Sequence, residues 1–503
     1  MEAVVDRARA WAQTERHFEV DAEQLRACLL AVLPADRVLC APEELAPYEC
    51  DGLSVFRAQP LAVVLPQSED EVVAVLKVCH EMGVPVVPRG AGTGLSGGAM
   101  PHPQGVVLSL ARLNRILAID PVARTARVQP GVRNLTISEA VAPYGLYYAP
   151  DPSSQIACTI GGNVAENSGG VHCLKYGLTV HNVLAVRGFT ASGEPVAFGS
   201  VAPDAPGYDL LALTIGSEGM LAVVTEITVR LLPKPVVAKC LLAAFDSVRA
   251  AGEAVAAVIA AGIIPAGLEM MDRGATVAVE DFIHAGYPTD AEALLLCEAD
   301  GTEAEVAEEI ARMKAVLEAH GATEIRVSRD EAERLRFWAG RKAAFPAAGR
   351  ISADYYCMDG TIPRRAIGAM LEAIREMESR YGLRCLNVFH AGDGNLHPLI
   401  LFDANVPGEW ERAEAFGAEI LERSVALGGT ITGEHGVGVE KINQMCVQFT
   451  PEEREAFFQI KAAFDPDGVL NPGKVIPTLH RCAEYGKMRV SGGALPFPDL
   501  PRF

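Results

Sequence analysis

Three glycine-rich segments interrupt apolar stretches in the first half of this sequence. They span residues 84–101 (VPVVPRGAGTGLSGGAMP), 150–170 (PDPSSQIACTIGGNVAENSGG) and 216–233 (GSEGMLAVVTEITVRLLP). Glycine-rich turns expose backbone N–H groups that can bind an anion, so the first segment indicates a diphosphate cradle. That segment has neither the spacing of a P-loop nor that of a Rossmann fingerprint. Ordinary turn glycines are an alternative, but three such loops in one part of the chain predict an extended nucleotide.

The pattern of apolar runs and turns divides the chain into four parts. Residues 57–235 alternate short apolar strands with Gly/Pro turns and one helix over 68–83, which is typical of an α+β domain. Residues 236–429 combine strands with an Ala-rich helix and a long charged helix, and these repeated β-α-β units predict a split βαβ, or ferredoxin-like, cap domain. An N-terminal segment, 1–56, precedes them, and a C-terminal segment, 430–503, follows.

Composition and charge exclude several classes of protein. At 503 residues and 50% hydrophobic content, the chain is long enough for two or three domains with their own cores. The net charge of −20 argues against a nucleic-acid partner and against direct contact with a membrane surface. The first 21 residues carry charges at short intervals and contain no apolar core, so we expect neither a signal peptide nor a membrane span, and a cytoplasmic location. The 12 cysteines show no C-x-x-C spacing, which predicts reduced thiols and excludes a usual iron–sulfur motif.

Two short segments near the C-terminus gather metal-binding residue types. His390 and His397 flank a Gly-rich turn between two apolar runs, so a hairpin would bring them together. Glu434 in TGEHGVG is the natural third ligand of an N/O set suited to zinc, or to manganese or iron. His435, next to it, would point away from Glu434 in an extended backbone, which makes it a candidate base. The alternative is that these four residues lie in unrelated places, each with ordinary hydrogen-bond partners.

The order of these motifs resembles a known family. PRGAGTGLSGG, PDPSS, IGGNVAENSGG, GSEGMLAVVTE, FHAGDGNLHP, GEHGVG and FDPDGVLNPGK follow one another as in the FAD-linked 2-hydroxy-acid dehydrogenases, from about residue 40 to the C-terminus. The resemblance implies an FAD-binding domain of the vanillyl-alcohol oxidase and p-cresol methylhydroxylase (PCMH) type, a ferredoxin-like cap and a C-terminal helical segment that returns to the flavin side. GRISADYYCMDGTIPRRA, INQMCVQF, TLHRCAEYG and LPFPDLPRF resemble more narrowly the FAD-containing subunits of bacterial glycolate oxidases.

The resemblance also implies which residues contact FAD. They come from the three glycine-rich segments and from the C-terminal FDPDGVLNPGK motif. The expected cofactor-binding residues are Pro88, Arg89, Gly90, Ala91, Gly92, Thr93, Gly94, Leu95, Ser96, Pro150, Asp151, Gly161, Gly162, Asn163, Asn167, Gly169, Gly170, Gly219, Val224 and Asn471. Some flavoproteins of this type tether FAD to a histidine in the first loop; GAGTGLSGG has none, so we expect non-covalent FAD.

Roles in oxidation of a small 2-hydroxy acid follow from the same resemblance. Arg341 in FWAGRKAAFP matches the arginine that binds the substrate carboxylate, and a planar guanidinium suits that task. His390, His397 and Glu434 would bind the divalent metal, His435 would take the hydroxyl proton, and Asn395 would position substrate or metal.

The substrate is expected to be a short monocarboxylate. Relatives that act on larger acids carry a lysine before a cap strand, whereas DYYCMDGTIP has none. Glycolate, oxidised to glyoxylate, is the first expectation, and D-lactate is the alternative, because one methyl group is worth only about 1–3 kcal/mol of discrimination. A metal-dependent hydrolase and a subunit that only relays electrons are weaker alternatives.

The sequence offers no second redox centre, so a reduced flavin needs an external acceptor. The resemblance implies a hetero-oligomer with a second flavin-type subunit and an iron–sulfur subunit that leads to the quinone pool. Association with the inner face of the membrane would then depend on those partners.

Overall fold

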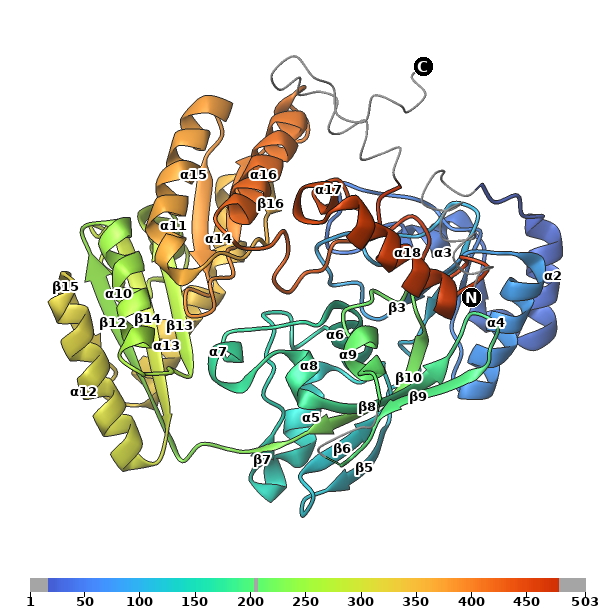
Figure 1. Ribbon diagram of the computed structural model, residues 1–503, viewed down its shortest axis with the longest axis horizontal. Helices are drawn as coiled ribbons and strands as arrows, with labels where there is room; N and C mark the ends of the chain where they lie inside the picture. Colours follow the sequence, from blue (N-terminus) through green and yellow to red (C-terminus); the bar gives the residue numbers. More distant parts are fainter. Residues whose placement is uncertain (1–16, 203–206, 479–503) are drawn as a thin grey trace.

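The computed structural model describes residues 17–202 and 207–478, which form two lobes (Figure 1). The first sixteen residues and the motif LPFPDLPRF lie outside these ranges, as does the motif TLHRCAEYG except for its first residue. The expectations for these segments therefore fall outside the described residues. Helices and strands are both abundant in each lobe, and the predicted α+β class is confirmed.

Two main sheets build the first lobe. The smaller has the order β1 (Val38–Leu39), β2 (Ala62–Val64), β4 (Val106–Ser109) and β3 (Val86–Arg89), with the last three parallel. The larger is antiparallel, in the order β5 (Ile116–Asp120), β6 (Thr125–Val128), β10 (Val223–Arg230), β8 (Val183–Phe189) and β9 (Pro195–Gly199). A two-stranded sheet joins β7 (Leu146–Tyr147) to β11 (Leu232–Pro233). The helices are α2 (Ala22–Val32), α3 (Pro42–Leu45), α4 (Glu69–Met82), α5 (Asn134–Val141), α6 (Ile160–Glu166), α7 (Cys173–Tyr176), α8 (Thr179–Asn182) and α9 (Leu210–Thr214).

Helix α4 shows why local sequence predicted its bounds well. The hydroxyl of Ser68 accepts a hydrogen bond from the backbone N–H of Glu71 and caps the first turn. Gly83 ends the helix at φ 65°, a conformation that glycine adopts without strain. The buried positions Val72, Val75, Leu76 and Cys79 recur at helical spacing and pack into the core beneath the parallel strands.

A seven-stranded antiparallel sheet forms the second lobe. Its order is β15 (Ala322–Val327), β12 (Val237–Phe245), β14 (Ala293–Gly301), β13 (Gly267–Asp272), β17 (Cys385–Phe389), β18 (Pro398–Phe402) and β16 (Asp354–Cys357). The first four strands have the ferredoxin-like order. The last three strands repeat part of this order. The helix α15 (Ile367–Tyr381) connects β16 to β17, and β18 lies between these two strands in the sheet. The sequence predicted the split βαβ arrangement but not its second, shorter copy within the same sheet.

Helices cover both faces of this sheet, so its strands are apolar on both sides. Leu241 and Leu242, neighbours on β12, face opposite layers and are both fully buried. One layer contains α10 (Val248–Ala260), α12 (Glu303–Ala319), α15 and α16 (Glu409–Ala426); the other contains α11 (Arg273–Ile283), α13 (Glu331–Lys342) and α14 (Ala344–Ile351).

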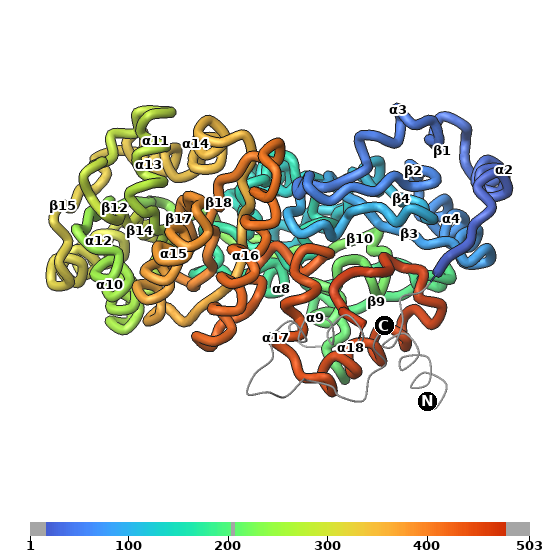
Figure 2. Tube along the Cα trace, turned by 90° about the horizontal axis from the view of Figure 1, so that it is seen from above, coloured from blue at the N-terminus to red at the C-terminus, as the bar shows by residue number. Residues whose placement is uncertain are grey.

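The C-terminal segment returns to the first lobe. It includes α17 (Met445–Gln448) and α18 (Pro451–Phe464), drawn in red beside that lobe in Figures 1 and 2. Leu470 forms a parallel bridge with Val86 of β3, and the Lys461 ammonium donates to the carbonyl of Met220 at 2.6 Å. This segment therefore completes the core of the first lobe after the chain has built the second.

Buried polar contacts join the two lobes. His172, after the second glycine-rich segment, contacts Asp151 through Nδ1 at 2.7 Å and Glu298 of β14 through Nε2 at 3.2 Å. Glu298 also accepts from Arg334 at 2.7 Å and from the indole of Trp338, both on α13. One carboxylate, 2% exposed, thus connects the first lobe to the helix that carries Arg341.

Two expectations from composition can be compared with the described residues. Ten of the described cysteines are free thiols, as expected. Cys446 is disulfide-bonded, so the prediction of reduced thiols is wrong at this position. Among the described helices, none has the length and apolar character needed to cross a membrane.

We predict that Glu298→Ala lowers the free energy of unfolding by about 1–3 kcal/mol, because the buried indole of Trp338 loses its acceptor and His172 and Arg334 each lose one of their two carboxylate partners. Urea unfolding of the FAD-loaded protein measures this change. The control is Glu308→Ala, which removes an exposed partner of Arg312 and should cost no more than about 1 kcal/mol. Equal effects of the two substitutions would contradict the role given to Glu298.

Candidate functional site

A cleft of about 440 Å³ lies between the lobes and is the candidate site. All three glycine-rich segments contribute to its wall, together with Arg341, Lys342, Phe345 and Pro346 from the α13–α14 region. His397, Glu434 and His435 line the same cleft. The nucleotide loops and the candidate reaction centre, separated by some hundreds of residues in sequence, therefore share one cavity.

The first glycine-rich loop follows β3 and approaches the second very closely. A Cβ on Gly90 would lie 2.3 Å from the hydroxyl oxygen of Thr159, so only glycine fits there. The Arg89 guanidinium folds beneath the loop, where it donates to the carbonyl of Cys50 at 2.7 Å. Gly92, at φ 70°, leaves room for that guanidinium. The loop is thus held from below, and its backbone is presented to the cleft.

The chemistry of the cleft wall fits a bound dinucleotide. Within the described residues, the hydroxyl of Thr159 and one carboxylate oxygen of Glu166 are buried and have no hydrogen-bond partner, and both residues line the cleft. Buried polar atoms of this kind call for a ligand or ordered water. Together with the exposed backbone of the loops, they could hold FAD.

The expected cofactor-binding residues divide into two groups by position. Those that line the cleft are Pro88, Arg89, Gly90, Ala91, Gly92, Thr93, Gly94, Leu95, Gly161, Gly162, Asn163, Gly219 and Val224. Those outside its wall are Ser96, Pro150, Asp151, Asn167, Gly169, Gly170 and Asn471. Several of the second group brace the loops; for example, the Asn471 amide donates to the carbonyls of Gly98 and Glu218 at 2.9 and 2.7 Å.

A pair of neighbouring carboxylates in this cleft was missed from the sequence. Glu166 and Glu218 both line it, and burial, followed by the charge of Glu218, raises the pKa of Glu166 well above its ordinary value. Glu218 accepts from the backbone N–H groups of Val437 and Gly438 at 2.6 and 2.8 Å. The third glycine-rich segment therefore fixes the loop that carries Glu434 and His435.

The predicted hairpin brings His390 and His397 together. His390 directly follows β17 and His397 directly precedes β18, and their ring centroids are 5.0 Å apart. Nε2 of His390 and Nε2 of His397 lie 3.3 and 3.0 Å from Oε1 of Glu434. One potential ligand atom from each of the three residues lies within 4.8 Å of the others, so this N/O set could hold a divalent metal ion.

Glu269 on β13 supports this group and was not found from the sequence. Its two oxygens accept from Nδ1 of His390 and from Nε of Arg341, each at 2.7 Å. Burial alone would raise the pKa of Glu269, but the positive charges of His390 and Arg341 lower it below its ordinary value. A carboxylate on the second nitrogen of a metal-ligating histidine is a common supporting contact, because it fixes the tautomer and the ring orientation.

Asp359 organises the loop of Glu434 and His435 and was also missed. It is fully buried, and its Oδ2 accepts from the backbone N–H groups of Gly433 and His435 at 3.0 and 2.8 Å. Burial would raise the pKa of Asp359, but His435 and Lys441 lower it. The carboxylate stays ionised and holds consecutive backbone donors in one orientation.

His435 lies beside His397, with its ring stacked at 5.0 Å between centroids. Burial lowers its pKa to about 4, so the imidazole is neutral near pH 7 and has a free lone pair. Asn395 belongs to the hairpin turn and is outside the cleft wall, although its side chain lies against Gly433, where a Cβ would be 2.4 Å from its Oδ1. The structure thus brings His435, Arg341 and the three candidate N/O ligands to one place, whereas Asn395 does not line the cleft.

This fold and this cleft define a flavoprotein oxidoreductase. Residues 60–199 match the family model described as "FAD binding domain", and residues 234–475 match "FAD linked oxidases, C-terminal domain". The chain belongs to the FAD-linked oxidase family.

Three comparisons place it more closely. "Glycolate oxidase subunit GlcD" of Escherichia coli (strain K12) is 64% identical over 485 residues, which are 96% of this chain and 97% of that protein. "D-lactate dehydrogenase" of Anaerostipes hadrus is 34% identical over 453 residues, 87% and 94% of the two chains. The solved structure of p-cresol methylhydroxylase with substrate bound has a TM-score of 0.75 at 19% identity and covers 91% of this chain and 97% of that one. The predicted family and PCMH-type fold are confirmed.

We predict that Gly169→Ala weakens binding of a divalent metal at least about tenfold while FAD is retained. A Cβ at this position would lie 2.5 Å from Oε2 of Glu434 and 2.9 Å from a methyl carbon of Leu178, so Glu434 would have to move. Metal content after dialysis against graded chelator, with flavin absorbance as the second reading, measures the effect. Gly349→Ala is the control, since its nearest neighbour would be 4.0 Å away; identical metal retention in both variants would contradict this geometry.

Proposed function

We propose that this chain oxidises glycolate to glyoxylate as the FAD-carrying subunit of a multisubunit dehydrogenase. The observation that carries the proposal is the single cleft in which the nucleotide loops meet Arg341, His397, Glu434 and His435. The 64% identity to a protein named as a glycolate oxidase subunit supports the choice of substrate.

Arg341 is proposed to bind the substrate carboxylate. It is 3% exposed and lines the cleft, and its Nε is held by Glu269, which fixes the plane of the guanidinium. The remaining guanidinium N–H groups form a planar fork suited to a carboxylate. Because Glu269 also orients His390, the carboxylate-binding group and the metal ligands are set at a fixed spacing.

His435 is proposed to take the proton of the substrate hydroxyl. Its neutral imidazole lies in the cleft beside His397, and Asp359 holds its backbone. His390, His397 and Glu434 would hold the divalent metal, zinc, manganese or iron, that lowers the pKa of the hydroxyl. When bound, non-covalent FAD would supply the acceptor for the hydride from C2, so that two electrons and one hydrogen leave the carbon while the hydroxyl proton goes to His435. Asn395 is proposed to position the loop of Gly433 rather than to touch substrate.

Electrons are proposed to leave through partner subunits. The relative in E. coli is named as a subunit, which supports a hetero-oligomer. A flavin-type partner and an iron–sulfur partner would provide the missing redox centres, and they would bring this chain, with its cytoplasmic location, to the inner face of the membrane.

Steady-state dye reduction with glycolate, D-lactate and D-2-hydroxyglutarate tests the substrate assignment. We expect the highest kcat/KM with glycolate and a much lower value with the dicarboxylate. D-lactate is the second candidate, because a D-lactate dehydrogenase is among the relatives. A higher kcat/KM for D-lactate than for glycolate would replace the proposed substrate by that alternative.

We predict that Arg341→Lys raises KM for glycolate roughly 10- to 100-fold with a smaller change in kcat, because a point charge replaces a charge-assisted fork worth about 1.5–3 kcal/mol. Initial rates over a range of glycolate concentrations measure KM and kcat separately. Arg336→Ala, which changes an exposed arginine of the same helix, is the control and should leave both values unchanged. An unaltered KM in Arg341→Lys would exclude the carboxylate role.

We predict that His435→Ala lowers kcat about 10²- to 10⁴-fold, the usual contribution of a general base, while FAD and metal contents stay near one per chain. Rapid-mixing measurement of flavin reduction gives the rate of the chemical step itself. Full turnover in a variant that retains both groups would remove the base assignment.

A further inference from the structure

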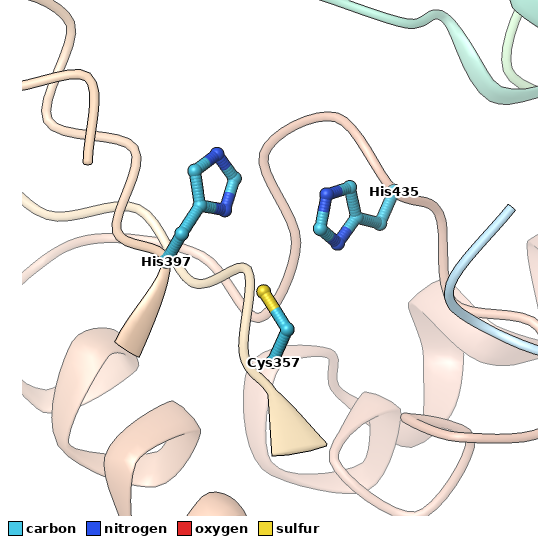
Figure 3. A group of neighbouring side chains, drawn as sticks. All are labelled: Cys357, His397 and His435. Atoms are coloured by element: carbon cyan, nitrogen blue, oxygen red, sulfur yellow. The ribbon is translucent and has the colours of Figure 1, made fainter. Parts of the chain in front are cut away.

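A second group of possible metal ligands lies beside the first and contains a thiol. Cys357, His397 and His435 each offer one ligand atom within 4.8 Å of the others, and Figure 3 shows the three side chains turned toward a common space. Cys357 is 5% exposed and His397 is 3% exposed, so the space is largely shielded from solvent. This group shares only His397 with the His390–His397–Glu434 set.

Two separate contacts in the fold bring these three residues together: a strand pairing and a backbone hydrogen bond. Cys357 ends β16 and pairs with Leu399 of β18, two residues after His397. Asp359, two residues beyond Cys357, holds the backbone N–H of His435 at 2.8 Å. The same short stretch of chain thus provides the thiol and fixes the second histidine.

Two buried nitrogen atoms in the group have no partner. Within residues 17–202 and 207–478, Nδ1 of His397 and Nδ1 of His435 are buried and make no hydrogen bond. The other nitrogen of His397, Nε2, faces Glu434 at 3.0 Å. Buried polar atoms without partners are rare, and here they accompany a thiol, which points to a bound cation.

We propose that Cys357, His397 and His435 form a second, thiolate-containing metal position that takes soft divalent ions such as cadmium. Thiolate ligands select soft ions, whereas the two-histidine, one-carboxylate set suits harder ones such as manganese. Side-chain shifts of roughly 1 Å would bring the three ligand atoms to the distances of a four-coordinate site with one open position. On binding, the thiol proton leaves to solvent and the sulfur–metal bond forms in its place.

The two metal positions compete for His397. A neutral imidazole has a lone pair on only one nitrogen, so His397 can serve the first position through Nε2 or the second through Nδ1, but not both in one tautomer. Both His397 and His435 line the cleft, which gives the ion a route of entry. An ion in the second position also occupies the lone pair of His435. Its effect on turnover therefore rests on the proposed function, in which His435 is the base. The prediction of a sulfur ligand does not rest on that function.

X-ray absorption at the cadmium edge of the FAD-containing protein, loaded with one equivalent of cadmium, tests the proposal. We expect a sulfur shell in the wild-type protein and in Cys297→Ala, a buried thiol of the same sheet that belongs to neither group. The sulfur shell should be absent in Cys357→Ser and Cys357→Ala. Cadmium affinity should fall at least about tenfold in these two variants, and manganese affinity should not.

Two results would overturn the proposal. They are a shell of nitrogen and oxygen only in the cadmium-loaded wild-type protein, and a sulfur shell that persists in either Cys357 variant. The wild-type spectrum decides whether sulfur is a ligand even if one variant fails to fold. The serine variant keeps the size of the side chain, so it tests whether Cys357 is the source of the sulfur if the alanine variant fails to fold. The role of His435 as base is tested separately, by dividing each variant's turnover rate with cadmium by its rate with manganese. A cadmium–sulfur shell in a fully active wild-type protein would uphold the metal position and contradict the role of His435.

Discussion

The candidate site depends on one buried carboxylate, Glu269. It stands on β13 in the middle of the cap sheet, 1% exposed, and holds His390 with one oxygen and Arg341 with the other. A buried carboxylate is stable only with compensating charge, and here both compensating groups belong to the proposed chemistry. The spacing between Arg341, the proposed carboxylate-binding group, and the proposed metal ligands is therefore set by a residue that does not itself line the cleft.

The same principle recurs where the lobes meet. Glu298 joins His172 of the first lobe to α13, the helix that carries Arg341, while Asp359 and Glu218 bind the backbone at the start and at the end of the 433–438 loop. Each of these carboxylates is buried and each contacts a segment far away in sequence. A site assembled from two lobes needs such contacts, because neither the glycine-rich loops nor the hairpin could orient the other alone.

The sequence predicted the parts of the site that are made by local pattern. Glycine clusters indicated the nucleotide loops, and the residue types and turn context of His390, His397 and Glu434 predicted a group that the structure brings together. It could not identify Glu269, Asp359 or Glu218, since a single acidic residue in a strand or turn reads as a surface position until its distant partners are known. A charged residue inside the apolar run GLEMM was the one available signal for Glu269. The motifs likewise did not reveal which of their residues line the cleft and which lie outside its wall, as Asn471 of FDPDGVLNPGK does.

The most direct test of the account is anaerobic titration of the FAD-loaded protein with glycolate, following flavin absorbance before and after treatment with a chelator. We expect bleaching in the metal-replete protein, loss of bleaching when the metal is removed, and recovery when it is added back. Bleaching that proceeds unchanged without metal would contradict the role of the His390–His397–Glu434 group, and no bleaching in metal-replete protein would contradict a complete glycolate site in this chain.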